Sequence, residues 1–195
     1  DCEYYKNMNY VDDGYFLIIG AQNRESTANF DATVYFFDQI YPLLGEAAPK
    51  IKIVGRNPDS VICALEKKYD CEVVGFVEDE RDYISRARAL LVPLRIGGGS
   101  RLKILTAFGM GKAVISTSKG SEGIDIENGK NILLADSPEL FAEHILSLQD
   151  DKYYAEKLGR NSRSLVEERY DWPVLGRKLA EFYRSSLRKM EQNEK

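Results

Sequence analysis

Histidine and cysteine are scarce in this chain. Among its 195 residues there is one histidine, His144, and there are three cysteines, Cys2, Cys63 and Cys71. No two cysteines form a CxxC pair, which excludes the common Cys/His ligand sets of zinc sites. Such a sparse, odd number of cysteines indicates reduced thiols and therefore favours a cytosolic setting.

Long apolar runs and targeting signals are also missing. No apolar stretch approaches the roughly 20 residues that a membrane-spanning helix needs, and the first residues do not have the pattern of a signal peptide. A net charge of −4 argues against a general nucleic-acid-binding protein, because such proteins gain affinity by neutralising phosphates. The chain begins with Asp1 rather than Met, so we expect it to be a fragment that lacks upstream sequence.

Two nucleotide-binding signatures are absent as well. The Walker pattern GxxxxGK[ST] does not occur, and the segment after the first expected strand, Gly20–Arg24, lacks the glycine fingerprint of nicotinamide-binding folds. These absences exclude the commonest P-loop and dinucleotide-binding proteins. Hydrophobic residues make up 44% of the chain and charged residues 30%, which are ordinary shares for a globular domain.

Short apolar segments alternate regularly with segments of helical periodicity. The pattern predicts strands at 15–20, 51–55, 72–77, 89–94, 113–117 and 132–136, and helices at 29–44, 60–69, 79–87, 100–110, 137–148, 150–169 and 171–190. This alternation is typical of an α/β fold, a Rossmann-like, doubly wound parallel sheet of about six strands. We expect one domain over 15–190, a linker or remnant of a preceding segment over 1–14, and a frayed tail at 191–195.

The most distinctive motif is a glycine loop after the fourth expected strand. It reads Gly97-Gly98-Gly99-Ser100-Arg101 and opens a helix. Ligands of open α/β sheets bind at the carboxyl ends of strands, and a helix N-terminus attracts anions. Ser100 is expected to cap the helix and to share one helix face with Lys103 and Thr106. Leu102, Leu105 and Phe108 are expected to pack on the sheet. The motif predicts a phosphate site, although a flexible turn with surface charges remains an alternative.

The residues around this loop resemble the C-terminal domain of the retaining glycosyltransferase family 4. Residues 93–124 are similar to a branch with the signature R-x-G-G-G-x-R-x-K-x-L-E-A. Further landmarks follow in the same order, namely Ile53–Pro58, Val74–Val77 and Tyr170–Trp172. The resemblance implies a GT-B architecture, in which two Rossmann-like domains face each other across a cleft. The C-terminal domain holds the donor nucleotide, and the N-terminal domain holds the acceptor.

The resemblance also implies roles for individual residues. Gly97, Gly98, Gly99 and Ser100 would hold the donor diphosphate, and Arg101, Lys103 and Arg24 would neutralise it. Phe76 and Val77 would border the base, and Glu122 would either touch the donor sugar or cap the next turn. No residue of this half is assigned as a catalytic group beyond Arg101 and Lys103, which would stabilise the leaving diphosphate. No metal or cofactor is implied, and the donor would be a UDP- or GDP-sugar.

One position departs from the family pattern. The glutamate of the "LEA" element, which binds the ribose hydroxyls in the family, is replaced by Thr106. A threonine hydroxyl cannot accept two charge-assisted hydrogen bonds, so we expect weaker ribose binding.

The leading functional hypothesis is transfer of a sugar from a nucleotide-diphosphate donor to a glycan or lipid, with retention and without metal, as in polysaccharide biosynthesis. The expected partners are the nucleotide sugar and a missing N-terminal acceptor domain, in the same or another chain. The chain alone is expected to be inactive. We expect a cytoplasmic location, with peripheral membrane contact through the missing half as an option. One alternative is a non-catalytic nucleotide-binding or partner subunit with a degenerate donor site. A nucleotide-sugar epimerase is a further alternative, disfavoured by the combination of GGGxRxK with YxW.

Overall fold

The computed structural model of the chain describes residues 1–6, 8 and 12–193. In this part of the chain six parallel strands form one sheet in the order β3-β2-β1-β4-β5-β6. The strands are β1 (Phe16–Ile19), β2 (Ile51–Val54), β3 (Cys71–Gly75), β4 (Ala89–Val92), β5 (Ala113–Ser116) and β6 (Leu133–Leu134). The order reverses between β1 and β4, as in doubly wound nucleotide-binding folds. The predicted fold class is therefore confirmed.

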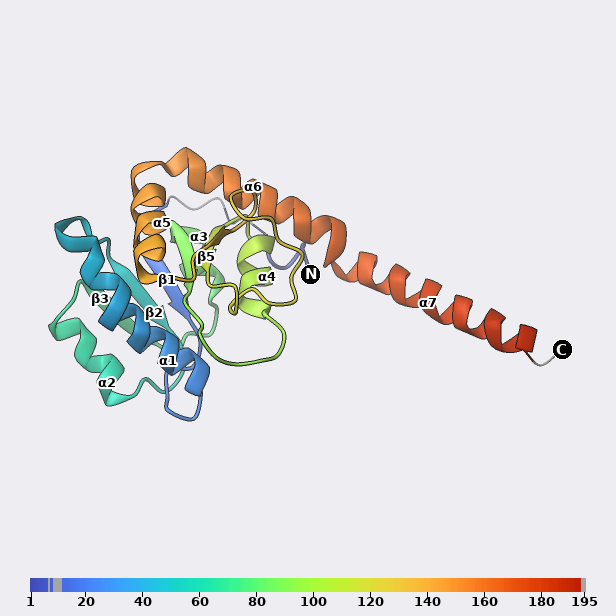
Figure 1. Cartoon of the computed structure of the whole chain (residues 1–195), viewed down its shortest axis with the longest axis horizontal. Coiled ribbons are helices and arrows are strands. Elements are labelled where there is room, and N and C mark those ends of the chain that lie inside the picture. Colours follow the sequence, from blue (N-terminus) through green and yellow to red (C-terminus); the bar gives the residue numbers. More distant parts are fainter. Residues whose placement is uncertain (7, 9–11, 194–195) are drawn as a thin grey trace.

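Helices cover both faces of this sheet (Figure 1). They are α1 (Thr27–Tyr35), α2 (Ser60–Cys63), α3 (Arg81–Arg86), α4 (Leu102–Gly109), α5 (Pro138–Asp150), α6 (Lys152–Arg169) and α7 (Trp172–Asn193). Helix α1 continues through a π-helical turn, η1 (Phe36–Ile40), and a 3₁₀ segment, η2 (Tyr41–Ala47), whereas α2 continues through a 3₁₀ turn, η3 (Ala64–Lys67). Helices α1, α2 and α5 pack on one face, and α3, α4 and the second half of α6 pack on the other.

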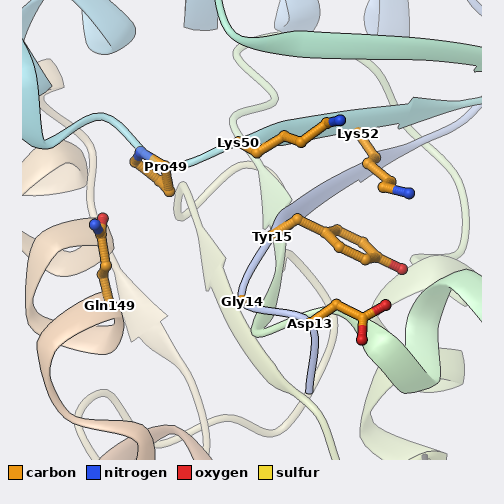
Figure 2. Close-up of a pocket in the computed structure, with 7 residues that line it drawn as sticks. All are labelled: Asp13, Gly14, Tyr15, Pro49, Lys50, Lys52 and Gln149. Atoms are coloured by element: carbon orange, nitrogen blue, oxygen red, sulfur yellow. The ribbon is translucent and has the colours of Figure 1, made fainter. Parts of the chain in front are cut away.

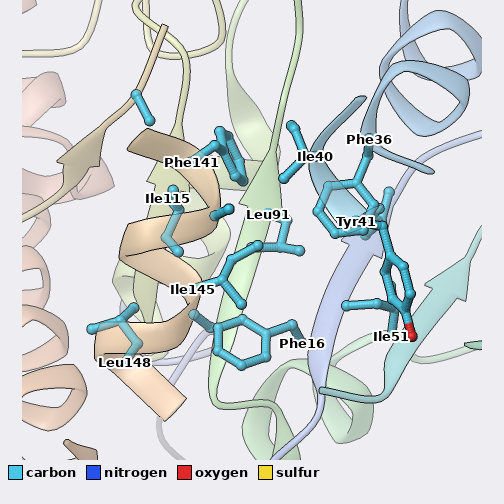
Figure 3. Close-up of a cluster of buried hydrophobic side chains, with 14 of the residues drawn as sticks. Phe16, Phe36, Ile40, Tyr41, Ile51, Leu91, Ile115, Phe141, Ile145 and Leu148 are labelled. Atoms are coloured by element: carbon cyan, nitrogen blue, oxygen red, sulfur yellow. The ribbon is translucent and has the colours of Figure 1, made fainter. Parts of the chain in front are cut away.

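The two faces explain why the strands are short and almost wholly apolar. All four residues of β1, β4 and β5 are buried, as expected for parallel strands that are covered on both sides. On the α1/α5 face, side chains of α5 such as Phe141 and Ile145 lie across the strands from Phe36 and Ile40 (Figure 3). This dense core fixes the strand ends that carry the loops of interest.

Helix α4 differs from its prediction at its start. It begins at Leu102 rather than Ser100, and Arg101 occupies the N-cap position. Within the described residues no side chain hydrogen-bonds to this helix end, so the expected capping by Ser100 is wrong. The reason is that the chain does not adopt helical torsions at Ser100 and Arg101, since Arg101 has φ −88° and ψ 53°.

The face of α4 that packs on the sheet also differs. Ile104, Ala107 and Phe108 are buried, whereas Leu102 is 65% exposed and Leu105 is only partly buried. Of the three residues expected on the sheet, only Phe108 is therefore fully buried. The expectation followed an i, i+3, i+6 spacing from Leu102, whereas the helix is rotated so that the row through Ile104 faces β4 and β5.

Part of the expected N-terminal linker is held against the domain. The Arg163 guanidinium donates to the carbonyl oxygens of Cys2 at 3.0 Å and Tyr5 at 2.6 Å. The Cys2 N–H donates to Asp171 at 2.9 Å. We call Asp1–Tyr5 the N-terminal strap; of the rest of the linker region, residues 7 and 9–11 lie outside the described residues. The division into linker, domain and tail stays a prediction.

Helix α7 projects from the domain (Figure 1). It runs through Asn193, so it includes part of the expected tail at 191–195, of which 194 and 195 lie outside the described residues. Its apolar residues Leu179, Phe182 and Leu187 are 55%, 64% and 60% exposed. In the part of the chain that the structure describes, no helix combines the length and the apolar character needed to cross a membrane.

The orientation of α4 can be tested by two matched substitutions on that helix. Ile104→Ala removes a side chain with 0% exposure and should lower the free energy of unfolding by about 2–5 kcal/mol. Leu102→Ala, at 65% exposure, should change it by less than about 0.5 kcal/mol. Urea unfolding of both variants measures the difference, and equal losses would contradict the observed rotation of the helix.

Candidate functional site

The loops that follow β1 and β4 meet at the point where the strand order reverses. A Cβ atom added to Gly97 would lie 2.9 Å from the Cβ of Ala28, at the start of α1. Gly97 also has a φ of +106°, a torsion that residues with side chains rarely adopt. Glycine is therefore required at this position, because it lets the loop after β4 pass close to the loop after β1.

Lys103 ties the two loops together. Its Nζ donates to the carbonyl oxygen of Ile19 at 2.5 Å and to Oδ1 of Asn29 at 2.8 Å. Burial, and secondarily the like charge of Arg101, lower the pKa of the Lys103 ammonium to about 8. The start of α4 is thereby fixed to the carboxyl end of β1, and a cation lies between the two loops.

Arg101 braces the glycine loop from within. Its side chain is buried, and its Nη atoms donate to the carbonyl oxygens of Gly97 and Gly98, both at 3.3 Å, and of Lys119 at 2.8 Å. Its Nε atom is buried and has no hydrogen-bond partner among the described residues. The guanidinium therefore joins the loop after β4 to the loop after β5 and adds positive charge behind the glycines.

The loop in front of Arg101 is open. Gly97, Gly98, Gly99 and Ser100 are all exposed, and α4 begins behind them without a side-chain cap in the described part of the chain. Free N–H groups at a helix N-terminus, with cations beside them, form a site for an anion such as a phosphate. The predicted glycine loop, Arg101 and Lys103 are thus brought together by the structure.

Two other cations at this edge of the sheet are already paired. Nε of Arg24 lies 3.1 Å from the carboxylate of Asp59, which caps α2. Arg95 lies 2.6 Å from Asp31 and stacks on the ring of Tyr35 at 4.4 Å. Arg24 is therefore placed on the rim beside α2, separate from the cluster of Lys103 and Arg101.

The remaining predicted residues lie around this centre. Glu122 is exposed and pairs with Lys119 at 2.6 Å and with Arg101 at 3.7 Å. The hydrogen bond from Lys119 is the main reason that the pKa of Glu122 is lowered. Phe76 is 66% exposed on the turn after β3, whereas Val77 is partly buried and packs against the hydrophobic core.

Thr106 faces a different hollow from the glycine loop. It lines a cavity of about 300 Å³ together with Tyr5 of the N-terminal strap, Leu102 and Leu105 of α4, and Trp172 of α7. Among the described residues, no hydrogen bond joins its side chain to Lys103 or Arg101. The structure therefore places the threonine one turn beyond the cations, against the strap.

The sequence did not reveal some residues that shape the site. Asn29 binds Lys103, the Lys119 carbonyl binds Arg101, and Tyr5 lies beside Thr106. Each comes from a segment distant in sequence from the glycine loop. The contact of Asn29 with Lys103 depends on how Asn29 is placed against the end of β1, and no linear sequence motif encodes that placement.

A second hollow lies at the opposite edge of the sheet. It has a volume of about 400 Å³ and is lined by Asp13, Gly14, Tyr15, Pro49, Lys50, Lys52 and Gln149 (Figure 2). Apart from Gln149 of α5, these residues precede or begin β1 and β2, so the hollow lies at the amino ends of the strands, where this fold class does not place its ligands. Lys50 and Lys52 are both paired with Glu72 at 3.3 Å. Among the described residues, no group of three or more His, Cys, Asp or Glu side chains is arranged to hold a metal ion.

Comparison with known proteins identifies the family. A profile of the family described as "Glycosyl transferases group 1" matches residues 14–151. The chain belongs to the glycosyl transferases group 1 family. The match includes the glycine loop and every strand of the sheet, and the predicted resemblance is confirmed.

Relatives of this glycosyl transferases group 1 member are longer than the chain. An uncharacterised 44.6 kDa protein from the cps region of Klebsiella pneumoniae is 26% identical in a 153-residue match that covers 73% of this chain and 39% of that protein. The fold is similar to Anabaena HepE in complex with UDP and glucose, with a TM-score of 0.74 and 14% identity over 95% of this chain and 55% of HepE.

The C-terminal domain of LpcC, a glycosyl transferase group 1 protein from Francisella tularensis, gives a TM-score of 0.69 and 17% identity, over 88% of this chain and 98% of that domain. The fold is therefore that of a GT-B C-terminal domain. The chain spans about two fifths of the curated relative and about half of HepE.

The lowered pKa of Lys103 predicts how stability depends on pH. The pKa of a lysine in an unfolded chain is about 10.4, whereas the pKa of Lys103 in the folded protein is about 8. Between these values the unfolded state binds more protons, so the contribution of Lys103 to stability rises with pH. The stability difference between the wild type and Lys103→Met should therefore be constant below pH 7 and shift in favour of the wild type from pH 8 to 10. Urea unfolding at each pH tests this, and a difference that stays flat over the whole range would contradict it.

Proposed function

We propose that the chain is the donor-binding half of a glycosyltransferase that takes a sugar from a UDP- or GDP-sugar. The observation that carries this proposal is the uncapped N-terminus of α4, which opens behind the exposed loop Gly97–Ser100 at the switch point of the sheet. Membership of the glycosyl transferases group 1 family supports it. The complex of similarly folded HepE with UDP and glucose favours a UDP-sugar as the first donor to test.

The donor diphosphate would lie against the glycine loop. Main-chain N–H groups of Gly97–Ser100 and of the first turn of α4 would donate to its oxygens. Lys103 would add positive charge from below, and Arg101 would hold the loop in its binding conformation while contributing its own charge. Arg24 and Glu122 would act at the rim, the turn at Phe76 and Val77 would border the base, and Thr106 would lie toward the ribose.

The proposed reaction is transfer of a glycosyl group. The bond between C1 of the sugar and the diphosphate oxygen breaks, and its electron pair stays on the diphosphate. A new bond forms between C1 and an acceptor oxygen, which gives up its proton. Negative charge grows on the diphosphate in the transition state, so prearranged N–H groups and cations lower the barrier. No described residue near the loop is placed as a base for the acceptor, and we assign that role to a second domain.

A second, N-terminal domain would bind the acceptor, a glycan or a lipid. The greater length of the relatives and the exposed apolar side chains of α7 support this partner. Retention of configuration and independence from metal follow from the family resemblance and are part of the proposal. So are a cytoplasmic location, which the sparse cysteines favour, and contact with a membrane through the second domain.

A non-catalytic nucleotide-binding subunit is the second candidate. It is favoured by Thr106, which replaces the family's ribose-binding glutamate and lies in a hollow closed on one side by the N-terminal strap. A subunit of this kind would bind nucleotide and have no turnover even with the second domain present.

Substitutions at Gly98 test the diphosphate site. A Cβ atom at this position would meet no atom within 4 Å, and the residue does not have a positive φ, so side chains should be tolerated. Gly98→Asp should weaken UDP or GDP binding about tenfold or more through repulsion of the phosphates. Gly98→Asn, of nearly the same size, should weaken it much less. Calorimetry and thermal unfolding of both variants separate charge from folding, and equal affinities would refute the assignment of the loop.

The exposed side chains of α7 test the need for a second domain. Leu179→Asp with Phe182→Asp should leave the unfolding of the 195-residue chain unchanged, because both side chains are exposed. In a protein fused to an upstream Rossmann-like domain, the same changes should reduce transferase activity about tenfold or more through loss of apolar contact. Activity is measured by donor-dependent product formation. Turnover by the 195-residue chain alone would contradict the proposal.

A further inference from the structure

Strand β2 carries a lysine in an otherwise apolar run. Lys52 is only partly buried, whereas the other three residues of the strand are buried. A charged residue is unusual in a parallel strand that helices cover on both faces. The Nζ atom of Lys52 lies 4.7 Å from the centre of the Tyr15 ring and 5.8 Å from that of Tyr83, distances at which a ring attracts a cation. Lys52 therefore interrupts the core with a cation that is held against two tyrosine rings.

Two hollows adjoin at this lysine, at the amino ends of the strands. The larger is the hollow of about 400 Å³ in Figure 2. The smaller, of about 250 Å³, is lined by Tyr15, Lys52, Asp82, Tyr83 and Arg86. Lys52 and Tyr15 line both hollows. The larger one alone falls within the range of about 300–1,000 Å³ that is usual for small-molecule pockets, so it has room for a complete ligand.

Beside the larger hollow, two ammonium groups share one carboxylate. The Nζ atoms of Lys50 and Lys52 both lie 3.3 Å from the same oxygen atom, Oε2 of Glu72. The three side chains together carry a positive charge, and each ammonium has more N–H donors than this one oxygen can use. At the rim, Asp13 and Arg86 lie 3.8 Å from each other and offset one another. The two lysines can therefore bind a further anionic group.

An amide without a complete set of partners lies across the hollow from Lys52. Gln149 belongs to the last turn of α5 and faces Lys52 and Asp13 from the opposite side (Figure 2). Its Oε1 atom is buried and has no hydrogen-bond partner among the described residues. The turn itself is fixed, because the Arg88 guanidinium donates to the carbonyl oxygens of Leu148 at 2.7 Å and Gln149 at 3.0 Å.

This amide can be satisfied by a ligand in the hollow. A buried oxygen atom without a donor is unfavourable. The last torsion of a glutamine side chain is broad, so the amide of Gln149 can turn Oε1 toward a donor. A hydroxyl group suits this position, because it can donate to Oε1 or accept from the amide N–H groups.

We propose that this hollow is a second ligand site, which binds a sugar that carries an anionic group, either a phosphate or a carboxylate. The anionic group would lie on Lys50 and Lys52, and hydroxyl groups would bond to the Gln149 amide. The exposed carboxylates of Asp13 and Asp82 can accept from further hydroxyl groups. The site lies at the edge of the sheet opposite the glycine loop, so it is separate from the proposed donor site and does not depend on it.

The test is an NMR titration of the isotope-labelled 195-residue chain with glucose 6-phosphate, glucuronate, glucose and inorganic phosphate. Glucose 6-phosphate or glucuronate should shift the side-chain amide signal of Gln149 and the backbone signal of Gly14. Either should bind about tenfold more tightly than glucose or inorganic phosphate, since each of these provides only one kind of contact. The better of the two acids shows whether the anionic group is a phosphate or a carboxylate.

Substitutions separate the two kinds of contact. Lys50→Met and Lys52→Met should each weaken glucose 6-phosphate or glucuronate about tenfold, the effect of one charge-assisted hydrogen bond. Lys157→Met, which removes an exposed lysine of α6, is the matched control and should change nothing. Gln149→Met should weaken the sugar acids and leave inorganic phosphate unchanged. Gly98→Asp, at the glycine loop, should leave this site unchanged.

The outcomes separate this inference from the proposed function. If neither acid shifts the signals of Gly14 and Gln149 at millimolar concentration, the second site is refuted and the donor site stands. It is also refuted if the shifts are confined to the glycine loop, because the sugar acids then bind only there. Equal affinities for inorganic phosphate and glucose 6-phosphate would refute a sugar as the ligand. Should Lys52→Met fail to fold, Lys50→Met decides, because the Lys50 side chain is exposed.

Discussion

The arrangement of the site depends on one buried contact, the bond of the Lys103 ammonium to the Ile19 carbonyl and the Asn29 side chain. It fixes the first turn of α4 to the carboxyl end of β1, across the point where the strand order reverses. A lysine in such a place loses hydration, which is why its pKa falls to about 8. Burial of the Lys103 ammonium is unfavourable. Its hydrogen bonds to the Ile19 and Asn29 oxygen atoms compensate for this cost.

The cations around the site have different partners. The Nη atoms of Arg101 donate to carbonyl oxygens of its own loop and of the loop after β5, whereas Arg24 and Arg95 are paired with carboxylates. The surface offered to an anion is therefore mainly main-chain N–H, backed by fixed charge. A site built in this way needs little rearrangement when a ligand arrives, which favours stabilisation of charge in a transition state.

The strand pattern was predictable because it depends on local composition. Runs such as Ala89–Val92 are apolar throughout, and only a strand covered on both faces tolerates this. The glycine loop was predictable for a similar reason, since Gly97 has a torsion that other residues avoid. The start of α4 was not, because the choice between Ser100 and Arg101 as the N-cap depends on where the loop must pass Ala28.

The sequence by itself determined that the chain is an α/β domain, that its glycine loop ends the fourth strand, and that the loop belongs to a glycosyltransferase type of motif. These features depend on residue type and spacing along a few neighbouring positions. Only the tertiary structure decided which groups the cations contact. Lys103 meets the side chain of Asn29, and Arg101 meets the carbonyl oxygen of Lys119. These pairings join residues 18 and 74 positions apart, and they exist only once the crossover connections have brought the strand ends to one edge of the sheet.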